Sequence, residues 1–161
     1  KWHSSWPEDG VNYPSERSVA LVEKAQKLFN EADDEDSLRS SITAFENVLL
    51  ENSGDYQALK QLSTQYILLG TAYTDNRSEK SEYYRKAMSY AERAMYTNPN
   101  FRLLADRGLK PWEAAGALSA NEVEAMFSQP EKKTPGMVIP PFLAVAKSRA
   151  ITPPATSAGA A

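Results

Sequence analysis

The stretch YILLGTAY, residues 66–73, places a glycine inside a segment that otherwise favours a helix. Large side chains flank Gly70 at helical spacing: Tyr66 precedes it by one turn, Leu69 is next to it, and Tyr73 follows it by one turn. A glycine inside a helix costs about 1 kcal/mol relative to alanine. A close contact that leaves no room for a side chain would offset this cost. We therefore expect another helix to pack tightly against Gly70.

Apolar residues recur at intervals of three and four over residues 15–98, which predicts four amphipathic helices joined by short polar turns. In chain order, the expected apolar stripes are Leu21, Ala25, Leu28 and Ala32; Leu38, Ile42, Phe45 and Leu49; Leu59, Leu62, Tyr66, Leu69 and Tyr73; and Tyr84, Ala87, Ala91 and Ala94. No segment alternates with a period of two for long enough to predict a strand. The expected fold class is all-α, built on two antiparallel helical hairpins.

Polar and helix-breaking residues between these stripes set the expected helix ends. The residues expected to begin the helices are Ser15, Ser37, Asp55 and either Asp75 or Ser78. The expected stops are the acidic turn at 33–36, Gly54 and Pro99. The acidic turn lacks the glycine and the regular alternation of a calcium loop, so we interpret it as a solvated turn that favours the next helix N-terminus.

The second hairpin resembles a tetratricopeptide repeat (TPR). The residues that match this pattern are Tyr66, Leu69, Gly70, Tyr73, Ala87, Ala94 and Pro99, with Ala91 where the pattern usually has Phe. The first hairpin matches less well, with Ala25 at the glycine position and Phe45 at the aromatic one. The resemblance implies that small residues opposite Gly70 let the two helices approach closely. A generic four-helix bundle is the alternative.

The segment NPNFRLLADRGLKPWEAAGALSANEVEAMF, residues 98–127, extends the comparison. Hairpins followed by short capped helices resemble the T-component (TatT) family of TRAP transporters. The resemblance implies a periplasmic, all-helical protein that associates with a substrate-binding protein and can form oligomers. The chain departs from the family where it becomes proline-rich, and it has no cysteine to carry a lipid.

Three regions are expected along the chain: an N-terminal arm at 1–14, a TPR-like helical domain at 15–127 and an extended proline-rich arm at 128–161. In the helical domain, Pro111 should open a short helix, and Ser119 with Glu122 should form a capping box. The C-terminal arm holds six of the ten prolines together with a group of apolar residues. We expect this group to bind a partner subunit: Met137, Val138, Ile139, Phe142, Leu143 and Val145.

Composition narrows the range of functions. A net charge of −3 and a pI near 5.3 argue against a nucleic-acid partner, and no apolar run is long enough to span a membrane. His3 is the only histidine and cysteine is absent, so we predict no catalytic, metal or cofactor site and no enzyme activity. Because the chain does not begin with Met, a removed export signal is one expectation, which would place the protein in the periplasm or cell envelope.

The tyrosines are the best candidates for a site in the helical domain. A groove for a ligand or partner between the third and fourth helices would be lined by Tyr66, Tyr73, Tyr84 and Tyr90, although core packing with hydroxyls at the surface is the alternative. We expect a non-catalytic scaffold subunit of a cell-envelope complex that binds other protein subunits and that can also form a homo-oligomer. The alternative is a TRAP T-component-like accessory protein that handles a small organic ligand together with a periplasmic binding protein.

Overall fold

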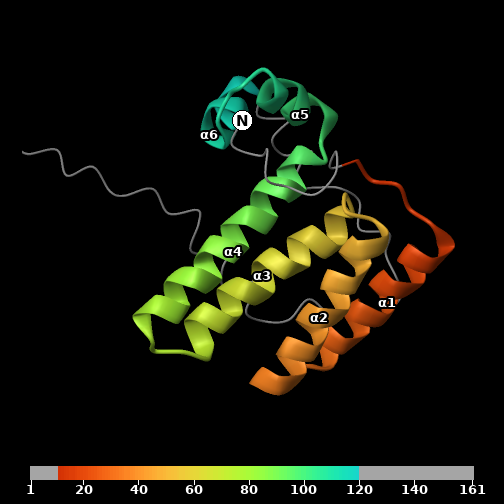
Figure 1. Ribbon diagram of the computed structural model, residues 1–161, viewed down its shortest axis with the longest axis vertical. Coiled ribbons are helices and arrows are strands. Elements are labelled where there is room, and N and C mark those ends of the chain that lie inside the picture. The colour runs from red at the N-terminus through yellow and green to blue at the C-terminus, as the bar shows by residue number, and fades with distance from the viewer. Residues whose placement is uncertain (1–10, 120–161) are drawn as a thin grey trace, which may run out of the picture. The chain divides into compact units, whose positions relative to one another are not determined.

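The computed structural model describes residues 11–119, which form an all-α structure without strands, as predicted. The helices of this range are α1 (Glu16–Glu31), α2 (Glu35–Glu51), α3 (Tyr56–Ala72), α4 (Arg77–Tyr96), α5 (Pro99–Asp106) and α6 (Pro111–Ala117), shown in Figure 1. Among these helices, none has both the length and the apolar character needed to cross a bilayer. Most of the predicted N-terminal arm, Glu122 of the expected capping box and the C-terminal arm lie outside the described residues.

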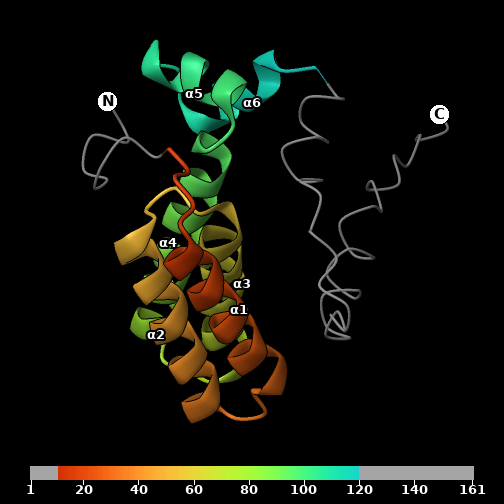
Figure 2. The ribbon, with the colours of Figure 1, turned by 90° about the vertical axis from the view of Figure 1, so that its right-hand side faces the viewer.

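The first four helices form two antiparallel hairpins, α1–α2 and α3–α4. Each helix lies beside the next one along the chain, so that α2 packs on both α1 and α3 (Figures 1 and 2). One hydrophobic core joins the two hairpins. Its buried members are Ala25, Phe29, Leu38, Ile42, Phe45, Val48, Ala58, Leu62, Tyr66, Leu69 and Ala87. Most belong to the predicted stripes, because residues spaced three and four apart share one face of a helix.

Side-chain caps begin the helices, and two of them differ from the prediction. Ser15 and Asp55 cap α1 and α3 as expected. Helix α2 begins earlier than predicted, because Asp34 accepts a hydrogen bond of 2.7 Å from the Ser37 amide, and Ser37 lies inside the first turn. Helix α4 is capped by Asn76, which accepts bonds from two amides, rather than by Asp75 or Ser78. In both turns the cap is a residue close to the predicted one, and its side-chain oxygen accepts from the free amides of the first turn.

Gly54 has a different role from the predicted helix stop. The C-cap of α2 is Asn52, and Gly54 does not adopt a positive φ. Instead, the chain before α1 crosses it so closely that a Cβ on Gly54 would lie 2.2 Å from the carbonyl oxygen of Val11. Asn52 holds this crossing segment by accepting a 2.9 Å hydrogen bond from the Tyr13 amide. The glycine is therefore required by close backbone approach rather than by backbone conformation.

Gly70 makes the close contact that its position predicts, but with another partner. The prediction of small residues directly opposite it is wrong, since the aromatic ring of Tyr84 lies there. A Cβ on Gly70 would lie 2.7 Å from Cε1 and 3.1 Å from Cδ1 of that ring. Tyr84 precedes the buried Ala87 by one turn of α4, and it meets α3 at the level of the glycine. The missing side chain accommodates an aromatic ring rather than a helix backbone.

Two short helices follow the hairpins; α6 was expected, whereas α5 was not. Pro99 ends α4 and also begins α5 as a first-turn residue, with Asn98 as the N-cap. Pro111 begins α6 in the same way. A small second core of Tyr96, Phe101, Ala105 and Ala114 holds α5 and α6 to the end of α4.

Candidate functional site

The tyrosines predicted to line one groove lie on two faces of the α3–α4 hairpin. Neighbouring residues in a helix point about 100° apart. Tyr66 and Ile67 of α3 therefore face different surroundings, and so do Tyr83 and Tyr84 of α4. One face packs towards α2 and the other is open.

The face towards α2 carries a cluster of three aromatic rings, Tyr66, Tyr83 and Tyr90, which we call the tyrosine cluster. The rings of Tyr66 and Tyr90 stack with centroids 5.7 Å apart and planes inclined by 13°. The ring of Tyr83 lies 6.2 Å from that of Tyr66 in a tilted arrangement. Lys86 places its ammonium group 5.4 Å from the centre of the Tyr66 ring. These contacts cover the Tyr66 ring, whose residue is only 7% exposed.

Polar groups of α2 satisfy the hydroxyls of the tyrosine cluster. The Tyr66 hydroxyl donates a 2.9 Å hydrogen bond to Oε1 of Glu46, and Nη2 of Arg39 donates a 2.7 Å bond to the Tyr83 hydroxyl. Burial, reinforced by the bond to Glu46, raises the pKa of Tyr66 above the usual range for tyrosine. Burial also raises the pKa of Tyr90, and the nearby Glu46 carboxylate adds to the shift. The cluster thus joins α2 to both α3 and α4, and the environment of Tyr66 and Tyr90 favours their protonated forms.

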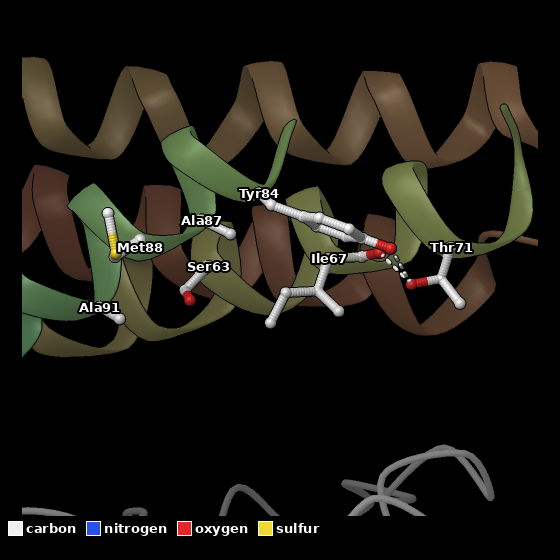
Figure 3. Close-up of a pocket in the computed structure, with 7 residues that line it drawn as sticks. All are labelled: Ser63, Ile67, Thr71, Tyr84, Ala87, Met88 and Ala91. Carbon is white, nitrogen blue, oxygen red and sulfur yellow. Dashed lines mark hydrogen bonds between the residues drawn. The ribbon is translucent and has the colours of Figure 1, made fainter. Parts of the chain in front are cut away.

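The open face carries a groove of about 340 Å³ between α3 and α4, which we call the α3–α4 groove. Its lining residues, drawn in Figure 3, are Ser63, Ile67 and Thr71 of α3 and Tyr84, Ala87, Met88 and Ala91 of α4. Three large side chains in it are well exposed: Ile67 by 50%, Tyr84 by 41% and Met88 by 59%. The hydroxyls of Tyr84 and Thr71 lie 3.3 Å apart at one end. The groove is mostly apolar, with a few hydroxyl groups along its edge.

The four predicted groove residues therefore separate. Tyr66 and Tyr90 come together in the tyrosine cluster, whereas Tyr84 lines the α3–α4 groove. Tyr73 is the C-cap residue of α3, is 36% exposed and lines neither. The six predicted partner-binding residues of the C-terminal arm lie outside the described residues.

Sequence reasoning missed the exposed apolar members of the groove, Ile67 and Met88. Ile67 follows Tyr66 and Met88 follows Ala87, and both of these neighbours belong to predicted buried stripes. The stripe pattern therefore placed neither Ile67 nor Met88 on a face of its own. Their signal was their spacing: Ser63, Ile67 and Thr71 recur every four residues on α3, and Met88 follows Tyr84 by four residues on α4.

Over residues 11–119, no group of three or more His, Cys, Asp or Glu side chains is arranged to hold a metal ion. The lining of the groove offers shape, apolar surface and a few hydroxyls. Such a site is suited to binding through contact area and is typical of protein interfaces more than of polar ligands.

Comparison of the chain with protein-family models, with curated proteins and with solved structures gives no significant match.

Proposed function

We propose that the protein is a non-catalytic interaction subunit of a multi-protein complex, with TPR-like hairpins that bind a neighbouring protein through the α3–α4 groove. The observation that carries this proposal is the gathering of Ile67, Tyr84 and Met88 around one groove, each with much of its surface in water. A lone exposed apolar side chain needs no explanation, but a group of them around a concavity is typical of a binding surface.

The packing of the hairpins supports the TPR-like part of the proposal. The two successive antiparallel hairpins share one core, and Ala25, at the place in the first hairpin that corresponds to Gly70, is fully buried. Proteins built from such hairpins contact their partners through surfaces formed by successive helices. The cell envelope is the proposed location, on the basis of the resemblance to the TatT family. The C-terminal arm, through Met137 to Val145, is the proposed second point of contact.

The alternative of a small-ligand accessory protein draws less support from the geometry. It requires tyrosine hydroxyls available to a ligand, whereas those of Tyr66 and Tyr83 are engaged by Glu46 and Arg39. A ligand there would have to break bonds that hold α2, α3 and α4 together.

The proposal is tested by purifying the tagged full chain from its own cells and measuring the native mass of what is recovered. We expect an assembly of fixed stoichiometry that includes at least one other protein. Met88→Glu should release the chain from it, because a charge would be buried in the groove. Leu50→Glu is the matched control, since Leu50 is 82% exposed on α2 and lies outside the groove. Recovery of the wild-type chain only as a monomer would refute the proposal.

A further inference from the structure

The two hairpins are related residue by residue. Each position in α3 corresponds to the position 45 residues earlier in α1; Gly70, for example, corresponds to Ala25. Each position in α4 corresponds to the position 46 residues earlier in α2, as Ala91 does to Phe45. On this basis every residue of the α3–α4 groove has a counterpart in the first hairpin. The pairs are Ser18 and Ser63, Val22 and Ile67, Gln26 and Thr71, Leu38 and Tyr84, Ser41 and Ala87, Ile42 and Met88, and Phe45 and Ala91.

In the first hairpin, these counterpart positions are where α3 is seated. Ser41 is fully buried and its hydroxyl lies 2.6 Å from Oε1 of Gln65 in α3. The side-chain oxygen of Gln26 accepts a 2.9 Å hydrogen bond from Nε2 of Gln61, also in α3. The apolar counterparts are buried in the core that α3 shares: Leu38, Ile42 and Phe45.

In the second hairpin, the same positions form an open groove. Ile42 is buried, but its counterpart Met88 is 59% exposed; Leu38 is buried, but its counterpart Tyr84 is 41% exposed. In the part of the chain that the structure describes, α5 packs on the end of α4 and lines no part of the groove. The second hairpin therefore presents the surface that seats a helix in the first hairpin, without a described helix on it.

Two charged residues that do not line the groove also repeat between the hairpins. Arg39 and Arg85 are counterparts, and so are Glu46 and Glu92. In the first hairpin, Arg39 donates to the Tyr83 hydroxyl and Glu46 accepts from the Tyr66 hydroxyl, so both bind residues of the following hairpin. Glu92 is partly buried, and this burial raises the pKa of its carboxyl group.

We propose that the α3–α4 groove seats an amphipathic helix of a partner protein, in the way that α3 is seated on α1–α2. This inference rests on the proposed function and specifies the partner. The partner helix would carry an apolar stripe spaced like that of α3: Ala58, Leu62, Tyr66 and Leu69. It would also carry a hydroxyl or other donor for Glu92, as Tyr66 of α3 does for Glu46.

A second copy of this chain is a poorer occupant. The buried members of the α1–α3 stripes already belong to the chain's own core, and α4 contributes only Ala87 to it. Outside the groove, the large apolar side chains that the described helices expose are dispersed, with Val19 on α1, Leu50 on α2, Leu103 on α5 and Trp112 on α6. None of these supplies a continuous stripe, and a helix needs one to bind a groove.

The test uses a peptide with the sequence of residues 55–74, in which Ile67→Lys improves solubility on the face that points away from the seat. A fluorescent label reports binding to the full chain by anisotropy. We expect saturable one-to-one binding that weakens by at least about tenfold with Met88→Glu in the protein and is unaffected by Leu50→Glu. A control peptide with Leu62→Lys and Tyr66→Lys should not bind, because its stripe is broken. Absence of saturable binding up to about 1 mM peptide would overturn the inference.

A photocrosslinking residue in place of Met88 in the full chain identifies the occupant. With the peptide present, the main product should be a crosslink to the peptide. A main product within residues 120–161 of the same chain, or with a second copy, would overturn the inference. If the peptide fails but Met88→Glu still releases the chain from its native assembly, the helix inference is wrong and the proposed function stands. If Met88→Glu also leaves the assembly intact, the groove is not the binding surface at all.

Discussion

The contact between Gly70 and Tyr84 should remove the gain in stability that Gly70→Ala would otherwise bring. Replacing a helical glycine with alanine normally stabilises the folded state by about 1 kcal/mol, because the unfolded chain loses freedom and the helix is favoured. At position 70 the new methyl group would lie 2.7 Å from Cε1 of Tyr84, far inside contact distance. The ring must move, and the Gly70→Ala variant loses the benefit.

The free-energy cost of Gly70→Ala depends on how far the Tyr84 ring can move away from the new methyl group. Overpacking costs about 1–3 kcal/mol in well-packed sites. Tyr84 is 41% exposed, so its ring can swing towards solvent, which places the cost in the lower part of that range. Against a gain of about 1 kcal/mol for the helix, Gly70→Ala should be neutral or destabilising by up to about 1 kcal/mol. Gly70→Leu adds a much larger side chain against the same ring and should cost several kcal/mol.

A double-mutant cycle separates the two effects. Urea unfolding followed by circular dichroism is measured for wild type, Gly70→Ala, Tyr84→Ala and the double variant. In the Tyr84→Ala background the ring is absent, so Gly70→Ala should stabilise by about 1 kcal/mol, with a coupling of about 1–2 kcal/mol between the sites. Stabilisation of the wild type by Gly70→Ala, or additivity of the two substitutions, would show that the glycine is not there for the ring.

Three further outcomes are expected. Gly54→Ala should cost about 1–3 kcal/mol in urea unfolding and remove the exchange protection of the Tyr13 amide, since its methyl group would meet the Val11 backbone; full protection in a stable variant would contradict the crossing described above. Tyr66→Phe should cost about 1–1.5 kcal/mol, because Glu46 loses a partly buried donor, and an unchanged urea midpoint would count against that bond. The phenols of Tyr66 and Tyr90 have raised pKa values, so the unfolded chain releases these protons first; stability should decline above about pH 10. The decline should be smaller in Tyr66→Phe, and an equal decline would exclude Tyr66 as its source.

The helices could be predicted from sequence because their signals are local. Three- and four-residue spacing marks the buried faces, and Ser15 and Asp55 act as caps through neighbouring amides. The start of α2 was misjudged because four consecutive polar residues, Asp33 to Asp36, can each supply a capping oxygen. The backbone conformation of the turn decides which of them becomes the N-cap, and in the structure it is Asp34.

The candidate site was harder to predict because it depends on which of two adjacent tyrosines faces α2 and which faces the α3–α4 groove. Tyr83 joins the tyrosine cluster and Tyr84 the groove, although both are tyrosines in the same turn. Their separation depends on the position of α2 relative to α4, which is a tertiary property. The correspondence between the hairpins was present in the sequence, but identical pairs such as Arg39 and Arg85 are few. The position of α3 on α1–α2 gives this correspondence its meaning, because the groove residues are the counterparts of residues that contact α3.

Hydroxyl-radical footprinting of the full chain, free and in its native assembly, tests the central claim that the α3–α4 groove is a protein-binding surface. Met88 is reactive and 59% exposed, while Trp112 is also reactive, 68% exposed and outside the groove. Modification of Met88 should fall to a small fraction of its free rate in the assembly, and modification of Trp112 should stay unchanged. Equal modification of Met88 in the free and assembled chain would contradict the account.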